Sequence, residues 1–435
     1  MLLGEQHRLS GEAALLDRQL RRAAIVLILA LPWFLLHSRA VAEIGIDLVA
    51  IAFLARCAVG RRWAWVKQDW VPVGLAWWGW LVLCTVWSVS RFGEGGTAVL
   101  QATLMVRFLV FVAALEHWAL RGERARRWLL GSLTLATLYV AAQTLLQFAT
   151  GRNLFGAPRY GDGELTGPFT KPRDAPTFVR MLFPALVPPA GTLLAQQGWR
   201  PRLGGMALII GGVAVVVLIG QRMPVLLAGL GLLVTGLLLP RLCGPVVVAV
   251  VAGGALIAAS VVVSPPTFYR LVTKFSRQME DFQDSPYGLI AERAVAIAEQ
   301  HPLTGRGYDG FRTGCPLPRY FQGWHWPGTP APPGGDATMC VTHPHNHYLQ
   351  AVTDAGLPGL VLFCALVGVW LYRLGQGLLN DPAPLRVGLF VAALIQEWPI
   401  ASTSPLISLP IGGWFFLLLG FGLAEAATAR SSRHR

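Results

Sequence analysis

Charged side chains are scarce in this chain: Asp, Glu, Lys and Arg make up 14% of its 435 residues, whereas 54% of the residues are hydrophobic. Soluble domains carry about 25% charged residues, so this composition excludes an ordinary soluble protein and indicates a polytopic membrane protein. The net charge of +13 comes from basic residues scattered over many short segments. We therefore expect contact with anionic membrane lipids and no nucleic-acid partner.

Metal-ligand motifs are missing as well. The sequence has no Cys-x-x-Cys and no His-Glu-x-x-His, and no Asp-x-Asp pair lies in the segments predicted to face outward. Because zinc and magnesium sites commonly use such spacings, the sequence predicts a protein without a metal or another cofactor.

What the chain has in quantity is long apolar runs. About twelve of them are long enough to cross roughly 30 Å of hydrocarbon. Lys and Arg gather in alternate connections, which predicts cytoplasmic ends by the positive-inside rule. The expected fold is an all-α polytopic membrane protein with about twelve transmembrane helices, near residues 23–39, 41–58, 71–90, 97–119, 128–149, 177–196, 203–220, 223–239, 245–263, 347–372, 384–399 and 409–428.

This pattern divides the chain into three parts. Residues 1–263 hold the first nine predicted helices, 264–346 form an outer loop domain, and 347–435 hold the last three helices and a cytoplasmic tail. Within the loop domain, 267–282 has apolar residues at helical spacing beside a cationic stripe that includes Arg270. We expect an amphipathic helix at the membrane interface there, and a second helix over 287–300.

Two of the six cysteines, Cys315 and Cys340, lie in this outer segment. Thiols on the outer side of the membrane meet an oxidising compartment, so the sequence predicts a disulfide between them. Closing a loop of about 25 residues would stabilise the fold by on the order of 3 kcal/mol.

Three histidines, His343, His345 and His347, occupy alternate positions directly before an apolar helix. They can be solvated residues at the membrane interface, or one of them can accept a proton at the mouth of a membrane-embedded active site. Alternate residues of an extended segment do not converge on one point, and no paired carboxylates stand nearby in the sequence, so we do not expect the three imidazoles to bind a metal ion.

Several arginines are predicted on the same outer side. Arg222 stands at the outer end of a span, and Arg270 and Arg293 lie on the two loop helices. Guanidinium forks bind phosphate oxygens bidentately and keep their charge, so this set suits a diphosphate substrate, although each arginine alone can simply reach the interface. Arg180 near the outer end of its span can join them, whereas Arg107 has no assigned role.

The pair His345-Asn346, followed by nine residues and then Gly356-x-x-Gly359, resembles the O-antigen ligase and Wzy-type polymerase superfamily. The long outer loop and the twelve-span frame are similar to that family, and the segment 301–307 is similar to its His-Pro-x-x-Gly-x-Gly element. The turn 220–222 adds to the likeness.

One position departs from the family pattern. Gln221 stands directly before Arg222, where the family is expected to have a small hydroxyl residue. The side chain that supports Arg222 must therefore differ here.

The resemblance implies a glycosyltransferase of the GT-C type in the bacterial inner membrane, with its active site facing the periplasm. The implied reaction moves O-antigen polysaccharide from undecaprenyl diphosphate to the lipid A core oligosaccharide, in lipopolysaccharide biosynthesis. It is expected to be an inverting, metal-independent displacement. In it, Arg222, Arg270 and Arg293 stabilise the departing diphosphate.

A histidine would take the proton of the acceptor hydroxyl. We favour His343, because Pro344 suits the first turn of a helix whose positive end keeps a neighbouring imidazole neutral. His345 is the other candidate, since it precedes Asn346. His347 is expected to pack or to cap the helix.

Other functions share this frame. A Wzy-type polymerase is expected to carry an Arg-x15-Gly element, but Arg152 is followed by Gly167 one residue early and Pro168 fills the required position. A protein O-oligosaccharyltransferase differs only in its acceptor. A lipid-linked oligosaccharide transporter needs neither the histidines nor a large outer loop.

Overall fold

In a computed structural model the protein is built from helices. The structure describes residues 2–93, 96–326, 328–402, 405–406, 408–409 and 411–433, and within these ranges the only extended pairings are isolated bridges. The α-helices are α1 (Leu2–His37), α2 (Arg39–Gly60), α3 (Trp70–Phe92), α4 (Gly96–Leu104), α5 (Val106–His117), α6 (Glu123–Thr150), α7 (Asp174–Ala195), α8 (Trp199–Ile219), α9 (Arg222–Leu238), α10 (Pro240–Val263), α11 (Pro265–Phe268), α12 (Lys274–Glu280), α13 (Pro286–Gln300), α14 (Gly310–Gly314), α15 (His347–Gly375), α16 (Pro384–Gln396) and α17 (Ile411–Arg433). The shorter turns are η1 (Ala64–Lys67), η2 (Ala119–Arg121), the π-helix η3 (Tyr269–Thr273), η4 (Pro318–Tyr320) and η5 (Ala337–Met339).

The chain is a multi-pass membrane protein. In the described part, nine helical stretches are long and apolar enough to cross a membrane: Ala14–His37, Trp70–Phe92, Gly96–Arg121, Glu123–Thr150, Ala175–Ala195, Trp199–Ile219, Pro240–Val263, His347–Gly375 and Gly412–Arg430. Two further apolar helices, α9 and α16, are shorter. Every predicted apolar run lies on a helix, but nine of these stretches, rather than twelve, have the length and composition of a span.

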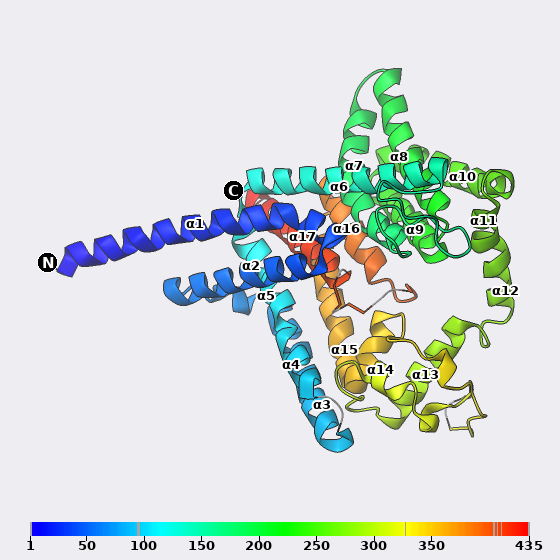
Figure 1. Cartoon of the computed structure of the whole chain (residues 1–435). Helices are drawn as coiled ribbons and strands as arrows, with labels where there is room; N and C mark the ends of the chain where they lie inside the picture. Colours follow the sequence, from blue (N-terminus) through cyan, green and yellow to red (C-terminus); the bar gives the residue numbers. More distant parts are fainter. Residues whose placement is uncertain are drawn as a thin grey trace.

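Helix α15 runs through the middle of the molecule (Figure 1). It packs against α3 and against α13 of segment 264–346, which is predicted to face outward and is called the outer segment below. On one side α1 packs against α2 and α6, and α5 against α17; on the other, α7 packs against α8 and α16. The outer segment passes from α10 through α11 and α12 to α13 and α14, and so returns to the start of α15 (Figure 1).

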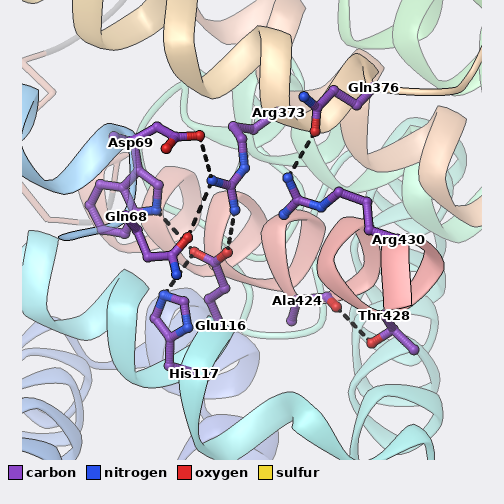
Figure 2. A network of polar contacts seen from close by, with 10 residues as sticks. Gln68, Asp69, Glu116, His117, Arg373, Gln376, Ala424, Thr428 and Arg430 are labelled. Carbon is purple, nitrogen blue, oxygen red and sulfur yellow. Dashed lines mark hydrogen bonds and ion pairs between the residues drawn. The ribbon is translucent and has the colours of Figure 1, made fainter. Parts of the chain in front are cut away.

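A buried charge network ties three of these helices together (Figure 2). Arg373 near the end of α15 donates to Asp69 at 3.1 Å and to Glu116 of α5 at 2.9 Å. The other oxygen of Glu116 accepts from the indole of Trp70 at 2.9 Å. The Arg373 and Glu116 side chains are 4% and 1% exposed, so removing one would leave the other charge buried, at a cost of about 3–5 kcal/mol.

Arg107, which the sequence left without a role, pairs with α2. Its guanidinium lies 3.3 Å from Asp47 and also bonds to Glu43. These carboxylates stand one helical turn apart on α2, so they present two acceptors to one fork. Arg107 therefore holds α5 against α2.

The outer segment 264–346 has a small core of its own. Ile290, Ile297, Phe311 and Tyr320 are buried together there. Cys315 and Cys340 form a disulfide beside this core, with Cα atoms 5.7 Å apart. The helices predicted over 267–282 and 287–300 are present, the first as α11, η3 and α12 in succession and the second as α13.

A second loop, between α6 and α7, is fixed by two side chains. Gln147 accepts from the backbone N–H of Thr166 at 2.7 Å. Asn153 donates to the carbonyl of Gly167 at 2.8 Å and accepts from the N–H of Ala157 at 2.9 Å. These bonds hold the loop close to the outer end of α9, where Gln221 also reaches it.

Candidate functional site

Two glycine-containing motifs lie against each other in the structure. The turn after α13 runs beside α15, where the N–H of Arg306 donates to the carbonyl of Thr353 at 2.8 Å. In return, the N–H of Leu357 donates to the carbonyl of Pro302 at 2.7 Å. The His-Pro-x-x-Gly-x-Gly segment therefore supplies a backbone partner at the point where α15 is interrupted.

Glycine is required on both sides of this contact. Gly356 has φ +67° and ψ −170° inside α15, and a Cβ there would collide with the backbone of Pro302 and Leu303. A Cβ on Gly305, which has φ +59°, would lie 2.6 Å from backbone atoms of Asp354 and its neighbour. Side chains cannot fit where two backbones approach this closely.

Helix α3 holds the same region from the other side. Trp80 donates to the carbonyl of Ala355 at 2.9 Å, and a Cβ on Gly359 would approach its ring to 3.5 Å. The hydroxyl of Thr85 accepts from the N–H of Tyr308 at 2.9 Å. The outer segment thus packs on α3 and on the part of α15 that follows the histidines in the sequence.

Asn346 starts α15. Its side chain accepts from the N–H of Tyr348 at 2.9 Å and donates to the carbonyl of Pro399 at 2.7 Å, so it caps the helix and ties it to the chain after α16. The helix begins at His347. The expectation that Pro344 stands in the first turn is therefore wrong, because the chain is still irregular there.

His343 and His345 lie together. Their ring centroids are 4.2 Å apart, and the ring of Tyr287 is 5.8 Å from that of His345. The backbone of His345 is left-handed, with φ +55°. Histidine tolerates this conformation better than most residues do.

His343 is half-buried and has one nitrogen without a partner. Its Nδ1 lies 3.2 Å from the hydroxyl of Thr342, while its Nε2 is buried and bonds to no described residue. Burial lowers the pKa of His343 to about 3, with smaller contributions from His345, Arg312 and His347. Its imidazole is therefore neutral at physiological pH and offers a lone pair for a proton.

His347 is buried and paired with an acid. Its Nδ1 lies 3.0 Å from the carboxylate of Glu397, and the hydroxyl of Tyr348 donates to the Glu397 carbonyl at 2.6 Å. Arg180, only 6% exposed, interacts electrostatically with Glu397. His347 thus packs, and Asn346 provides the helix cap.

The side chain of Arg270 binds the turn that ends α8. Its guanidinium donates to the carbonyls of Gly220 and Ile219 at 3.3 Å and of Asp162 at 2.6 Å. At 7% exposure it is buried, so its expected place on an exposed cationic stripe is wrong. Burial lowers the pKa of Arg270, and the nearby carboxylates of Glu164 and Asp162 oppose that shift.

Arg222 lies next to this turn and forms fewer hydrogen bonds with described residues than Arg270 does. Of its five N–H groups, one bonds to a described residue, Gln278 of α12, and its guanidinium lies 5.9 Å from the centre of the Phe275 ring. Gln221, at the position that departs from the family pattern, bonds to Glu164 instead of to Arg222. Within the described part of the chain, the other four donors of Arg222 have no protein partner.

Arg293 is built into the core of the outer segment. It donates to the carbonyls of Cys315 at 3.0 Å and Gly334 at 3.2 Å, and it lies 4.1 Å over the Phe321 ring. Its exposure is 3%, and burial lowers its pKa, while the carboxylate of Glu292 acts in the opposite sense. Any contact with a substrate would add to this structural role.

The predicted residues thus fall into three groups. Arg222 and Arg270 share the turn between α8 and α9, and Arg293 lies beside the disulfide. The histidines stand at the start of α15, where His347 contacts Glu397, the carboxylate with which Arg180 interacts. In the part of the chain that is described, no three His, Cys, Asp or Glu side chains are grouped so as to hold a metal ion.

Comparison with known families gives a match. Residues 206–364 match the family model described as O-antigen ligase, Wzy_C. This region of the chain is therefore similar to a Wzy_C O-antigen ligase domain. Family members are membrane glycosyltransferases that act on lipid-linked glycans, and they include ligases, Wzy polymerases and O-oligosaccharyltransferases. A search of curated proteins finds no match to the chain.

The Wzy_C domain contains most of the predicted site. It begins within α8 and ends within α15, and so includes Arg222, Arg270, Arg293 and the three histidines, but not Arg180. Sequence reasoning missed Glu397, which lies beyond this domain. A carboxylate at the end of an apolar run was the signal that could have revealed it, since such charges need partners.

Proposed function

We propose that this protein is an O-antigen ligase, which moves O-antigen polysaccharide from undecaprenyl diphosphate to the lipid A core oligosaccharide at the periplasmic face of the bacterial inner membrane. In this proposal α9, α16 and α2 cross the membrane together with the nine stretches named above, giving the twelve spans of a GT-C-type enzyme. The observation that carries the proposal is the match to the O-antigen ligase family over 206–364, the part of the chain that holds the histidine pair and the outer arginines.

The proposed reaction is one inverting displacement. The acceptor hydroxyl oxygen attacks the anomeric carbon of the donor glycan and forms the new glycosidic bond, while the bond from that carbon to the diphosphate oxygen breaks. A histidine, His343 or His345, takes the hydroxyl proton, and undecaprenyl diphosphate leaves with the electron pair. The buried, unpartnered Nε2 of His343 supports its assignment as the base.

The arginines are proposed to stabilise the leaving diphosphate. Arg222 has free N–H donors, and Arg270 holds the turn that positions Arg222. Arg293 and Arg180 add positive charge from buried positions. Fixed cations act most strongly where charge develops in a site sheltered from water, so no metal ion is needed in this mechanism.

A reconstituted transfer assay tests the proposal. Purified full-length protein in liposomes, supplied with undecaprenyl-diphosphate-linked glycan and lipid A core in EDTA, should release one undecaprenyl diphosphate for each glycan attached to the core. The glycan should keep its length, because a polymerase would extend it. Longer glycan chains, transfer only to a protein acceptor, or activity that returns only with magnesium or manganese would each contradict the proposal.

A further inference from the structure

A cavity of about 630 Å³ lies where the end of α7 meets the first turns of α8 and α10. Two arginines line it, Arg202 from α8 and Arg241 from α10. Its other walls are apolar and include Leu203 and Met206. The cavity therefore combines two cations with a hydrophobic surface, far along the chain from the histidines.

The two cations have no acidic partner among the described residues. No Asp or Glu stands between Asp174 and Glu280 in the sequence. Neither Arg202 nor Arg241 forms an ion pair with a residue that the structure describes. Two like charges held at one cavity, without counter-charges, attract an anion from outside the chain.

The surroundings of the cavity are those of a water–lipid boundary. It is formed by the ends of three candidate spans, α7, α8 and α10. Trp199 at the start of α8 is 67% exposed and carries the guanidinium of Arg200 5.4 Å from its ring centre. Exposed tryptophan next to arginine is typical of the headgroup level of a bilayer.

We propose that this cavity binds the headgroup of an anionic phospholipid from the surrounding leaflet. The phosphodiester would lie between the guanidinium groups of Arg202 and Arg241, which suit phosphate oxygens, and an acyl chain would follow Leu203 and Met206. A free phosphate ion would use the arginines alone and leave the apolar wall exposed. The proposal does not depend on glycan transfer.

Lipid titration of the detergent-purified full-length protein, followed by native mass spectrometry, tests this site. Phosphatidylglycerol should bind more tightly than phosphatidylcholine with the same acyl chains, by about tenfold or more. The double variant Arg202→Ala/Arg241→Ala should lower the affinity for phosphatidylglycerol by about 30-fold, since each arginine near an anionic lipid contributes several-fold. The charge-keeping variant Arg202→Lys/Arg241→Lys should retain part of the affinity.

Two further variants separate the cavity from general surface charge. Arg200→Ala removes the same charge two residues from Arg202 without touching the cavity, and should change the affinity by less than about threefold. Met206→Trp fills the cavity but keeps both arginines, and should weaken phosphatidylglycerol binding as much as the double variant does. Melting temperatures of all variants show whether each remains folded.

Three results would overturn the proposal. An equal loss in Arg200→Ala would show that any surface arginine attracts the lipid. Unchanged binding in the folded Met206→Trp variant would show that the lipid does not enter the cavity. Competition by inorganic phosphate at the same concentration as the lipid would show that the arginines bind a free anion and that the apolar wall contributes nothing.

Discussion

The carboxylate of Glu397 lies 3.0 Å from Nδ1 of His347, and both side chains are less than 5% exposed. A buried carboxylate on one imidazole nitrogen fixes the ring orientation and its tautomer. His347 is the first residue of α15 and directly follows the segment with His343 and His345. Its contact with Glu397 therefore fixes the position at which that segment joins the helix. Glu397 is therefore a positioning residue in the proposed site.

We expect Glu397→Gln to lower turnover by about 10- to 100-fold, because small displacements of reacting groups have effects of this size. Donor affinity should stay within about threefold, since Glu397 contacts a histidine and not the proposed diphosphate site. Turnover and donor binding are measured on the same purified variant. Glu425→Gln, which removes a carboxylate paired with Arg126 at 2.7 Å, is the matched control. A parallel loss of folded yield and activity in both variants would contradict a specific role.

The disulfide between Cys315 and Cys340 closes a loop beside the core of the outer segment. We expect both thiols to resist alkylation until the protein is reduced. Reduction should lower the stability of the outer segment by on the order of 3 kcal/mol, the chain-entropy value for a loop of this length. Peptide mass spectrometry is the measurement, since it separates this pair from the free cysteines Cys57, Cys84, Cys243 and Cys364, which lie in or beside the predicted spans. Alkylated Cys315 in protein purified without reductant would refute the pairing.

The helices were predictable and the pairings between them were not. A segment that crosses a bilayer must satisfy its own backbone, so apolar runs indicate helices directly from sequence. Whether a run such as α2 has the composition of a span is a finer question, because its charges, Glu43 and Asp47, are compensated by Arg107 from another helix. Such a partner is invisible in one sequence.

The conformation of the histidine segment could not be predicted from the sequence either. Its position before a helix was predictable, but the left-handed backbone of His345 and the contact between the rings of His343 and His345 were not. The burial of Arg270 was missed for a related reason. Its acceptors are backbone carbonyls at the end of α8, and no side-chain pattern announces them.

The proposed diphosphate clamp makes a prediction at Arg222. We expect Arg222→Ala to weaken donor binding by about tenfold or more, because hydrogen bonds to a charged group contribute about 1.5–3 kcal/mol. Arg222→Lys should recover only part of the loss, since an ammonium keeps the charge without the bidentate fork. Donor affinity and kcat/KM are measured together.

Arg293 provides the comparison for this clamp. Its guanidinium already bonds to the carbonyls of Cys315 and Gly334, so Arg293→Ala should lower the folded yield as well as donor affinity, whereas Arg222→Ala should keep a normal yield. Normal donor affinity in a folded Arg222→Ala protein would remove Arg222 from the clamp.

The pH dependence of transfer tests His343 as the base. In the free protein the pKa of His343 is lowered to about 3, so its base form is already complete at pH 5 and does not increase towards pH 8. If His343 is the base, kcat/KM, which reports the free enzyme, should be flat between pH 8 and pH 5. A base with the ordinary histidine pKa of about 6.5 would instead lose about tenfold for each pH unit below that value.

Binding of the donor substrate should change the pKa of His343. A bound diphosphate places negative charge near His343, which favours the imidazolium and raises its pKa towards the range where a base is most effective. The acid limb of kcat, which reports the complex, should therefore lie at higher pH than that of kcat/KM. With the base identified in this way, His343→Ala should lower turnover by about 10²- to 10⁴-fold and leave donor binding nearly unchanged. A His343→Ala protein with normal yield and near-normal turnover would transfer the role to His345, whose ring centroid lies 4.2 Å from that of His343.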